Sequence, residues 1–370
     1  MAYNNRRIYF PTQLFGFAPM GSTDYIAAHG AQSVGINTNF TLENIQELGQ
    51  ISVYQIVEQV PEIEVTTEKV IDGYPPLYCL ATQGAPNGSL AGRSNQRVMF
   101  ALSIYEDIQS SASGTPLGQA TTSGLYFSSV NYTFGTDQAF RESVSLVGNN
   151  IQWIDSGFTF TPNFVNDDSP LALAGSGGAQ IRRDIIFSPC LGVSDPNRAK
   201  ETAATLDVNG QLNAFLTILP PDIPGISSSG TNDTLSDGQF SAHITSLACG
   251  TQVGRDAILE IGRREPYFRF ANFPVEVTTD IGINGQVGTF VNAIENGTDG
   301  FGNNLINRTI KIRVREGLFL DLGKKNKLRS VTYGGGDTTG GQVTCNYSYV
   351  NFNDFTVTHP QDPSNITWPY

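Results

Sequence analysis

The sequence predicts a mainly β protein, with two tandem antiparallel β-sandwich or barrel domains and a central insertion. Glycine and proline are frequent, at 39 and 19 of 370 residues, and this composition favours short strands joined by many turns. Several apolar runs alternate with polar residues at the period of two that marks a half-buried strand. The third observation is an internal repeat, in which the same motifs recur in both halves of the chain.

Three pairs of motifs share their order and nearly their spacing: ENIQELG (43–49) with DAILEIG (256–262), IEVTTE (63–68) with VEVTTD (275–280), and SVNY (129–132) with SVTY (330–333). The distance from the glycine of the first motif to the EVTT strand differs by one residue between the halves. Such agreement in order, spacing and wording indicates a duplicated domain.

The repeat divides the chain into four parts, namely an N-terminal extension (1–31), a first domain (32–154), a connecting segment (155–239) and a second domain (240–370). The connecting segment has no counterpart elsewhere in the sequence. Its glycine, proline and serine content predicts a long connection with a few short strands.

Within the domains, alternation predicts strands at Ile51–Val57 and from Ile63 onward, which we expect to pair as a hairpin around Pro61. A short helix is expected at 75–81, where proline is tolerated in the first turn. Further strands are predicted at Arg97–Tyr105, Leu125–Phe134 and Ile310–Val314. Each domain is therefore expected to be an antiparallel sandwich or barrel with at most one helix.

Charge and composition exclude several functional classes. A net charge of −12 disfavours a surface that grips nucleic acid, because binding phosphate requires clustered Lys and Arg. Charged residues make up only 15% and hydrophobic residues 39% of the chain, which predicts a folded protein with a packed core.

Recognisable catalytic motifs are missing from the sequence. The three histidines, His29, His243 and His359, belong to no metal-binding pair or nucleophile motif and are interpreted as surface or turn residues. The four cysteines lie far apart, so neither a disulfide framework nor a zinc site is expected. We therefore expect a protein that is not an enzyme and that has no cofactor or metal.

Carboxylates gather on one face of the repeated strand. Glu62, Glu64 and Glu68 alternate with apolar or uncharged residues, and Glu276 and Asp280 occupy the equivalent face in the second half. This pattern fits a solvated strand face; it also fits the acidic wall of a channel. The notable basic cluster is interpreted either as a solvated hairpin or as a contact with an acidic neighbouring subunit, and it comprises Lys311, Arg313, Arg315, Lys324, Lys325, Lys327 and Arg329.

The repeated regions resemble bacteriophage tail tube proteins. The resemblance is carried by the run from Gln32 to Gly73, by GRDAILEIGRREPYFRFANFPVEVTTDIGI (254–283) and by LGKKNKLRSVTYGGGD (322–337). It covers both repeat copies and leaves the connecting segment unexplained. Tail tube proteins stack as rings with sixfold symmetry, in which each domain contributes hairpins to an inner β-barrel.

For a chain with two tail-tube domains, this resemblance implies a homotrimer with pseudo-sixfold symmetry. It implies stacking of such rings into the channel through which DNA leaves the virion, so that double-stranded DNA passes without specific binding. The acidic strand face would then line the lumen and keep DNA from adhering. Sheath, tail terminator and baseplate proteins are the implied partners, with no membrane involved.

Two other functions remain open at the level of sequence. One is a baseplate hub or distal tail ring, which also uses duplicated tube domains. The other, from a different class, is a carbohydrate-binding β-sandwich adhesin or receptor-binding protein. The N-terminus MAYNNRRIYF lacks the apolar core of a signal peptide, so we expect assembly in the bacterial host cytoplasm and residence in the virion tail.

Overall fold

The computed structural model describes residue 8 and residues 10–105, 116–155, 178–185, 217–220, 223, 226, 243–263, 265–285, 306–315, 317–335 and 342–364. The expectation of a mainly β, antiparallel fold is confirmed over these residues. Most of the segment at 155–239, for which a few short strands were expected, lies outside them.

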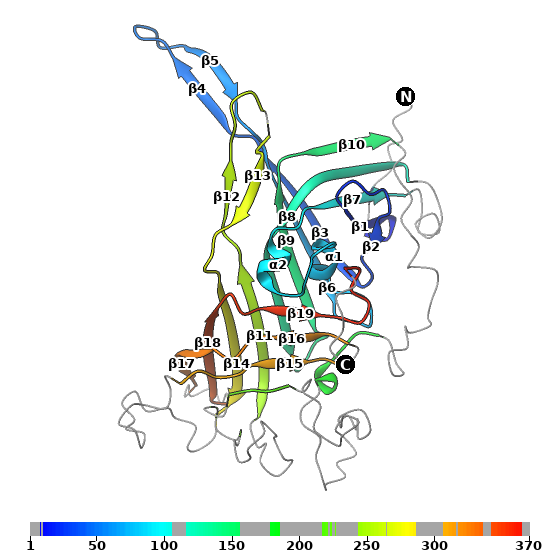
Figure 1. The fold of residues 1–370 in the computed structure, drawn as a ribbon, viewed down its shortest axis with the longest axis vertical. Coiled ribbons are helices and arrows are strands. Elements are labelled where there is room, and N and C mark those ends of the chain that lie inside the picture. Colours follow the sequence, from blue (N-terminus) through cyan, green and yellow to red (C-terminus); the bar gives the residue numbers. More distant parts are fainter. Residues whose placement is uncertain are drawn as a thin grey trace.

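One long sheet organises the molecule (Figure 1). Every neighbouring pair of strands in it is antiparallel. Its strands run in the order β3 (Ala31–Asn39), β6 (Glu62–Val70), β9 (Arg141–Gly148), β8 (Gly118–Gly135), β11 (Ile244–Gln252), β14 (Glu276–Asn284), β18 (Thr344–Phe352) and β17 (Lys327–Gly334).

The sheet contains the same four-strand order twice. We call β3-β6-β9-β8 the first repeat and β11-β14-β18-β17 the second repeat. The EVTT motifs lie on β6 and β14, the second strand of each repeat. SVNY and SVTY lie on β8 and β17, and each follows a register shift at the same place, between Phe127 and Ser129 and between Leu328 and Ser330. Because the sheet continues from β8 directly into β11, the boundaries between the two domains stay a prediction.

Two hairpins prolong the sheet at one end (Figure 1). The first consists of β4 (Leu42–Gln46) and β5 (Val53–Glu58), and the second of β12 (Arg255–Ile258) and β13 (Phe268–Ala271). The predicted hairpin around Pro61 is wrong, because β5 pairs with β4 while β6 pairs with β3 and β9. Alternation identifies strands but not their partners, and the chain reverses instead near Gly49, whose φ of 91° suits glycine.

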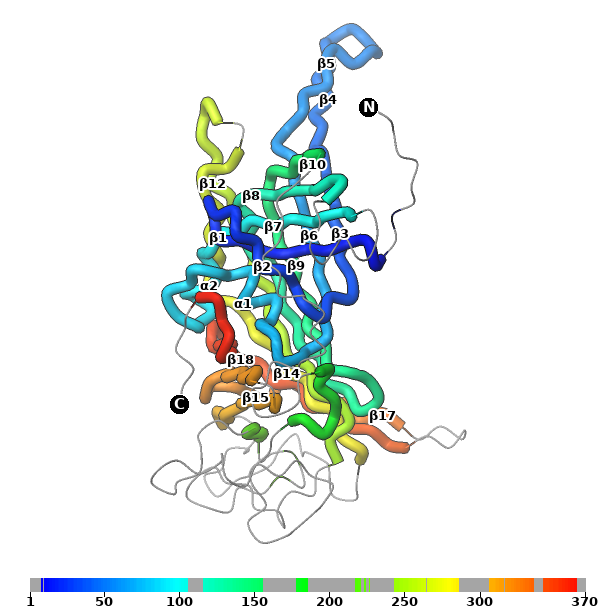
Figure 2. The backbone as a smooth tube through the Cα atoms, turned by 90° about the vertical axis from the view of Figure 1, so that its right-hand side faces the viewer, coloured from blue at the N-terminus to red at the C-terminus, as the bar shows by residue number. Residues whose placement is uncertain are grey.

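A second layer covers one face of the long sheet (Figure 2). In the first half it consists of η1 (Phe10–Thr12), β1 (Gln13–Pro19), β2 (Ile26–Ala27), β7 (Val98–Ile104), the start of β8 and β10 (Ile151–Asp155). In the second half it consists of β15 (Lys311–Arg313), β16 (Phe319–Asp321) and β19 (Thr356–Thr358). The short helices are α1 (Leu77–Ala81), α2 (Leu90–Ser94) and η2 (Arg182–Asp184).

The expected strands around residues 97–105, 125–134 and 310–314 correspond to β7, part of β8 and β15. The helix expected at 75–81 is α1. The limit of one helix per domain is wrong, since α1 and α2 both lie in the first half. The serine at 89 explains the second one, because its side chain accepts a hydrogen bond from the Gly92 amide and caps α2.

Alternate side chains of the long sheet form the core. Val65 on β6 and Val277 on β14 are fully buried, as are Val144 on β9 and Tyr347 on β18. These residues belong to one continuous hydrophobic cluster that spans both repeats. Full burial of each such side chain stabilises the fold by about 1.5–3 kcal/mol. The two repeats are therefore joined by a shared core as well as by strand pairing.

A buried carboxylate connects α1 to the long sheet. Glu142 on β9 accepts hydrogen bonds from the Leu77 amide at 2.5 Å, the Tyr78 amide at 2.9 Å and the Tyr132 hydroxyl at 2.7 Å. Burial raises the pKa of Glu142, although these hydrogen bonds act in the opposite direction. The carboxylate thus satisfies two amides at the start of α1 that have no partner within the helix.

We expect Glu142→Ala to lower the free energy of unfolding by more than about 3 kcal/mol, because three buried donors lose their acceptor at about 1–3 kcal/mol each. Glu142→Gln retains one acceptor oxygen and the size of the side chain, so its loss should be smaller. Urea denaturation followed by tryptophan fluorescence measures both variants. An alanine variant as stable as the unchanged protein would rule out this role.

Candidate assembly surfaces

The face of the long sheet opposite the second layer carries the predicted acidic residues. On β6 the residues alternate, with Ile63, Val65 and Thr67 buried and Glu62 and Thr66 exposed. On β14, Val277 and Thr279 are buried and Glu276 is exposed. The predicted assignment of residues to the two strand faces is thus confirmed; whether this polar face lines a lumen stays a prediction.

Arginines accompany three of the five carboxylates on this face. Glu68 pairs with Arg141, Glu62 with Arg269 and Glu276 with Arg329. Glu64 and Asp280 have no ion pair within the described part of the chain. The face is therefore mixed in charge, with a small excess of carboxylates, where the sequence pattern indicated an acidic strip.

The predicted basic cluster is divided by the fold. Arg313 on β15 is only 7% exposed, so it is not available to a neighbouring subunit in this structure. Lys311, on the same strand, lies 3.5 Å from Asp321. Arg315 is half-buried just beyond β15. The exposed members are Lys324, Lys325, Lys327 and Arg329, at the start of β17.

The junction between the repeats is a strand pair, β8 with β11. Seven residue pairs join these strands, from Ser246 with Gly135 to Gln252 with Ser129. Gly250 lies opposite Asn131, and a Cβ atom on this glycine would stand 2.0 Å from the Asn131 Oδ1 and 2.7 Å from the Val130 carbonyl oxygen. A glycine at this position lets the two strands approach closely.

The long sheet has an unpartnered strand at each end. Among the described residues, β3 and β17 form the outer strands of the long sheet, with no further strand beside them. Gly35 on β3 is the counterpart of Gly250, since each lies opposite the first threonine of EVTT, Thr66 or Thr278. A Cβ on Gly35 would meet only the Thr66 hydroxyl, at 2.7 Å. The space that Asn131 fills over Gly250 is thus open over Gly35.

Arg255, at the base of the second hairpin, connects that hairpin to the first repeat. Its Nε donates a hydrogen bond to the Phe127 carbonyl at 2.8 Å, and its Nη2 donates to the Ser94 carbonyl at 2.6 Å. The guanidinium also lies 4.8 Å from the centre of the Tyr126 ring. Burial lowers the pKa of Arg255 to about 10, so the group is still charged at neutral pH.

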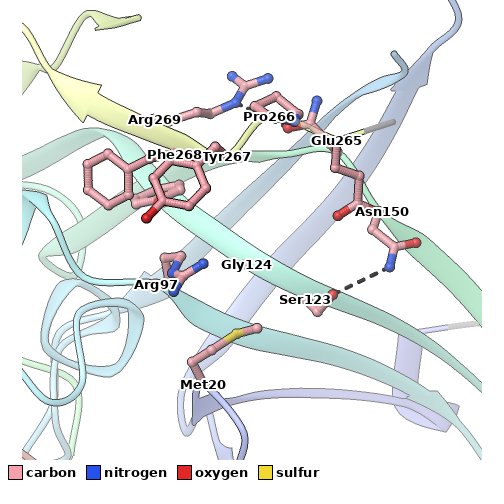
Figure 3. Close-up of a pocket in the computed structure, with 12 residues that line it drawn as sticks. Met20, Arg97, Ser123, Gly124, Asn150, Glu265, Pro266, Tyr267, Phe268 and Arg269 are labelled. Carbon is pink, nitrogen blue, oxygen red and sulfur yellow. Dashed lines mark hydrogen bonds between the residues drawn. The ribbon is translucent and has the colours of Figure 1, made fainter. Parts of the chain in front are cut away.

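Arg269 makes a second connection, beside a cleft between the hairpin and the first repeat (Figure 3). Its Nε donates to the Asn149 Oδ1 at 3.2 Å, and its Nη1 lies 3.4 Å from the Glu62 Oε1. The neighbouring Phe268 ring packs edge-on against Tyr126, with 5.7 Å between the ring centres. The second hairpin is therefore held on the first repeat by two cations and one aromatic contact.

The first hairpin, β4–β5, has no such support in the described chain, and its side chains are largely exposed. Leu48 and Ile51 at its tip are fully exposed, and Leu42, Tyr54 and Ile56 along its strands are 55%, 70% and 55% exposed. An apolar surface of this kind marks a site of contact with another molecule.

Other polar groups serve the fold. The His29 Nδ1 lies 2.7 Å from the Asp72 Oδ2. His359 is buried and therefore not a surface residue, but it begins a turn, since its carbonyl accepts a hydrogen bond from the Asp362 amide at 3.0 Å. Cys79, Cys249 and Cys345 are free and buried. In the described ranges no cluster of His, Cys, Asp or Glu is suited to a metal ion. None of the described helices has the length and apolar character needed to cross a membrane.

Sequence reasoning did not identify Gly35, Gly250, Arg255 or Arg269 as interface residues. The glycines gave only a weak signal, because Gly35 lies 31 residues before Thr66 whereas Gly250 lies 28 residues before Thr278, so their spacing differs between the repeats. The arginines gave no signal, since their importance depends on which strands become neighbours.

No known protein family matches the sequence, and no curated protein matches it. A chain of the solved structure described as "Cryo-EM structure of the anti-feeding prophage (AFP) baseplate, 6-fold symmetrised" is similar with a TM-score of 0.31 and 11% identity, covering 41% of this chain and 97% of that chain. A chain of the "anti-feeding prophage cap (AFP tube terminating cap)" is similar with a TM-score of 0.29 and 12% identity, covering 42% and 99%. These similarities are too low to assign a function, which has to be inferred from the surfaces described above.

Proposed function

We propose that this protein is a structural component of a phage tail tube, not an enzyme, and that three copies form a ring through which DNA passes. In this ring β17 of each copy pairs with β3 of the next. Three copies of the long sheet then give six repeats around one axis. Such rings stack to form the tube.

The observation that carries the proposal is the junction of β8 with β11. It joins the last strand of the first repeat to the first strand of the second, which is the same combination that β17 and β3 offer at the two ends of the long sheet. Because β17 corresponds to β8 and β3 to β11, a second copy can repeat this pairing, with Thr332 over Gly35. Fusion of two repeats makes every second junction intramolecular, which raises its effective concentration.

The composition of β3 also supports pairing with another copy. This outer strand has nine residues, AQSVGINTN, and contains neither a charged residue nor a proline. Soluble proteins usually protect a long outer strand with charges, prolines or a covering segment, because an unprotected one joins other chains. A strand without such protection is suited to assembly.

The polar face of the long sheet, opposite the second layer, has the character expected of a channel wall. Its side chains are mainly polar, and the second layer lies on the opposite face, so closing the ring around this polar face leaves the second layer outside. Clustered lysines and arginines on the wall would hold DNA phosphates. Here Arg141, Arg269 and Arg329 are paired with carboxylates, which reduces their attraction for DNA.

A baseplate hub or distal tail ring remains the second candidate within phage tails, since it would use the same trimeric ring. Unlimited stacking of rings distinguishes a tube protein from it. For the carbohydrate-binding alternative, the cleft beside Arg269 is the surface to examine, because it combines polar groups with Tyr267 and Phe268.

Electron microscopy and mass photometry of the purified protein test the proposal. We expect hollow rings or tubes whose unit has three times the mass of the 40.0 kDa chain. A protein that remains monomeric at all concentrations would contradict the proposal and direct attention to sugar binding.

A further inference from the structure

We propose that the first hairpin docks on the second repeat of the neighbouring copy through an apolar contact between Ile56 and Phe352. This inference rests on the proposed ring. It defines a surface for a second copy of this chain that the strand pairing alone does not require.

The position of Ile56 follows from the equivalence of the two hairpins. In each hairpin the first backbone hydrogen bond is in the same place, from the Gln59 amide to the Thr41 carbonyl and from the Asn272 amide to the Gly254 carbonyl. Counting along the strands from these bonds places Ile56 at the position of Arg269, and Leu42 at that of Arg255. Ile56 and Leu42 are each 55% exposed.

The position of Phe352 follows from the equivalence of β9 and β18. Ser145 on β9 lies opposite Ser129, and Ser348 on β18 lies opposite the corresponding Ser330. Four residues further on stand Asn149 in the first repeat and Phe352 in the second. Phe352 is 53% exposed.

Both sides of the contact therefore change character together. Inside the chain, Arg269 bonds to Asn149 and lies beside Glu62. At the free junction, isoleucine replaces the arginine and phenylalanine replaces the asparagine, while the β14 residue paired with Phe352 is Glu276, a carboxylate like Glu62 that is already paired with Arg329. A cationic contact within the chain thus corresponds to an apolar contact between chains.

The physical reason lies in the different demands on the two junctions. The internal junction is held by the chain itself, so a polar contact is sufficient there. Copies that meet in solution lose translational and rotational freedom, which opposes their association. Burial of apolar surface is the main source of free energy that can offset this loss.

Cross-linking and a charge exchange test the inference. We expect Ile56→Cys/Phe352→Cys to form disulfide-linked dimers and trimers under mild oxidation, whereas Leu48→Cys/Phe352→Cys, with its first cysteine at the hairpin tip, should not. Ile56→Arg alone and Phe352→Glu alone should each weaken ring formation about tenfold or more. The double variant Ile56→Arg/Phe352→Glu should recover most of this loss, since the two charges attract.

The possible outcomes separate the two proposals. Suppose that the unchanged protein forms rings, but that Ile56→Cys/Phe352→Cys gives no cross-links or Ile56→Arg/Phe352→Glu shows no recovery. Either result would overturn the docking contact and leave the proposed ring intact. An unchanged protein that forms no ring would overturn both. The cysteine and charge variants are all at exposed positions, and circular dichroism confirms that each still folds.

Discussion

Gly35→Val is expected to abolish ring formation while leaving the single chain folded. Within the chain the added Cβ would meet only the Thr66 hydroxyl, which can rotate away. At the equivalent Gly250 a Cβ would collide with Asn131 and with the backbone of β8. If β17 of another copy lies on β3 as β8 lies on β11, the added side chain would collide with Thr332 and with the backbone of β17 at every junction between copies.

Such overpacking costs about 1–3 kcal/mol per junction, which corresponds to about 5-fold to 150-fold in the dissociation constant of each junction. Mass photometry at several concentrations measures the loss of rings, and thermal unfolding checks that the monomer is intact. Gly35→Ala adds only the Cβ and serves as a milder variant should the valine disturb folding. Asn37→Val, on the same face of β3, is the control and should still form rings. A valine variant that assembles normally would rule out the inferred pairing.

Arg93→Met is expected to destabilise the fold by about 3–5 kcal/mol, because it leaves a buried carboxylate without its partner. The side chains of Arg93 on α2 and Asp362 near the C-terminus are 0% and 1% exposed and form an ion pair. Arg93 also donates to the Thr82 hydroxyl at 2.8 Å and to the Val357 carbonyl at 3.3 Å. Arg93 thus joins the first half of the molecule to β19 and to the segment that follows it.

The double variant Arg93→Met/Asp362→Leu removes both charges and is expected to be more stable than Arg93→Met alone. Urea unfolding of the three proteins gives the comparison. A single variant that loses less than about 1 kcal/mol would show that water reaches Asp362 and that the pair is not essential. Because Ser94 directly follows Arg93 on α2, we also expect the single variant to weaken the contact of Arg255 with the Ser94 carbonyl.

Much of the architecture could be predicted from the sequence because it depends on local sequence patterns. The IEVTTE and VEVTTD strands revealed the repeat, and the alternation on β6 assigned its two faces correctly. Each of these conclusions depends on residues close together in the chain. The short helix α1 was likewise visible from its own few residues.

The pairing of strands and side chains that are far apart in the sequence could not be predicted in this way. The strand at 53–58 was expected to pair with its successor, yet it pairs with β4, because periodicity carries no information about which strand lies alongside. Arg313 was predicted to belong to a basic cluster at the surface, but it lies on β15 of the second layer and is buried. Glu142 and Arg255 owe their roles to neighbours that only the folded chain brings together.

The two outer strands of the long sheet differ in sequence, and this gives the proposed assembly a direction. Each copy offers two different outer strands, so the junction between copies is head-to-tail and not the pairing of one surface with itself that joins a symmetric dimer. Growth stops only when the curvature of the sheet returns the last free end to the first. A slight change in that curvature would turn the closed circle into an open spiral.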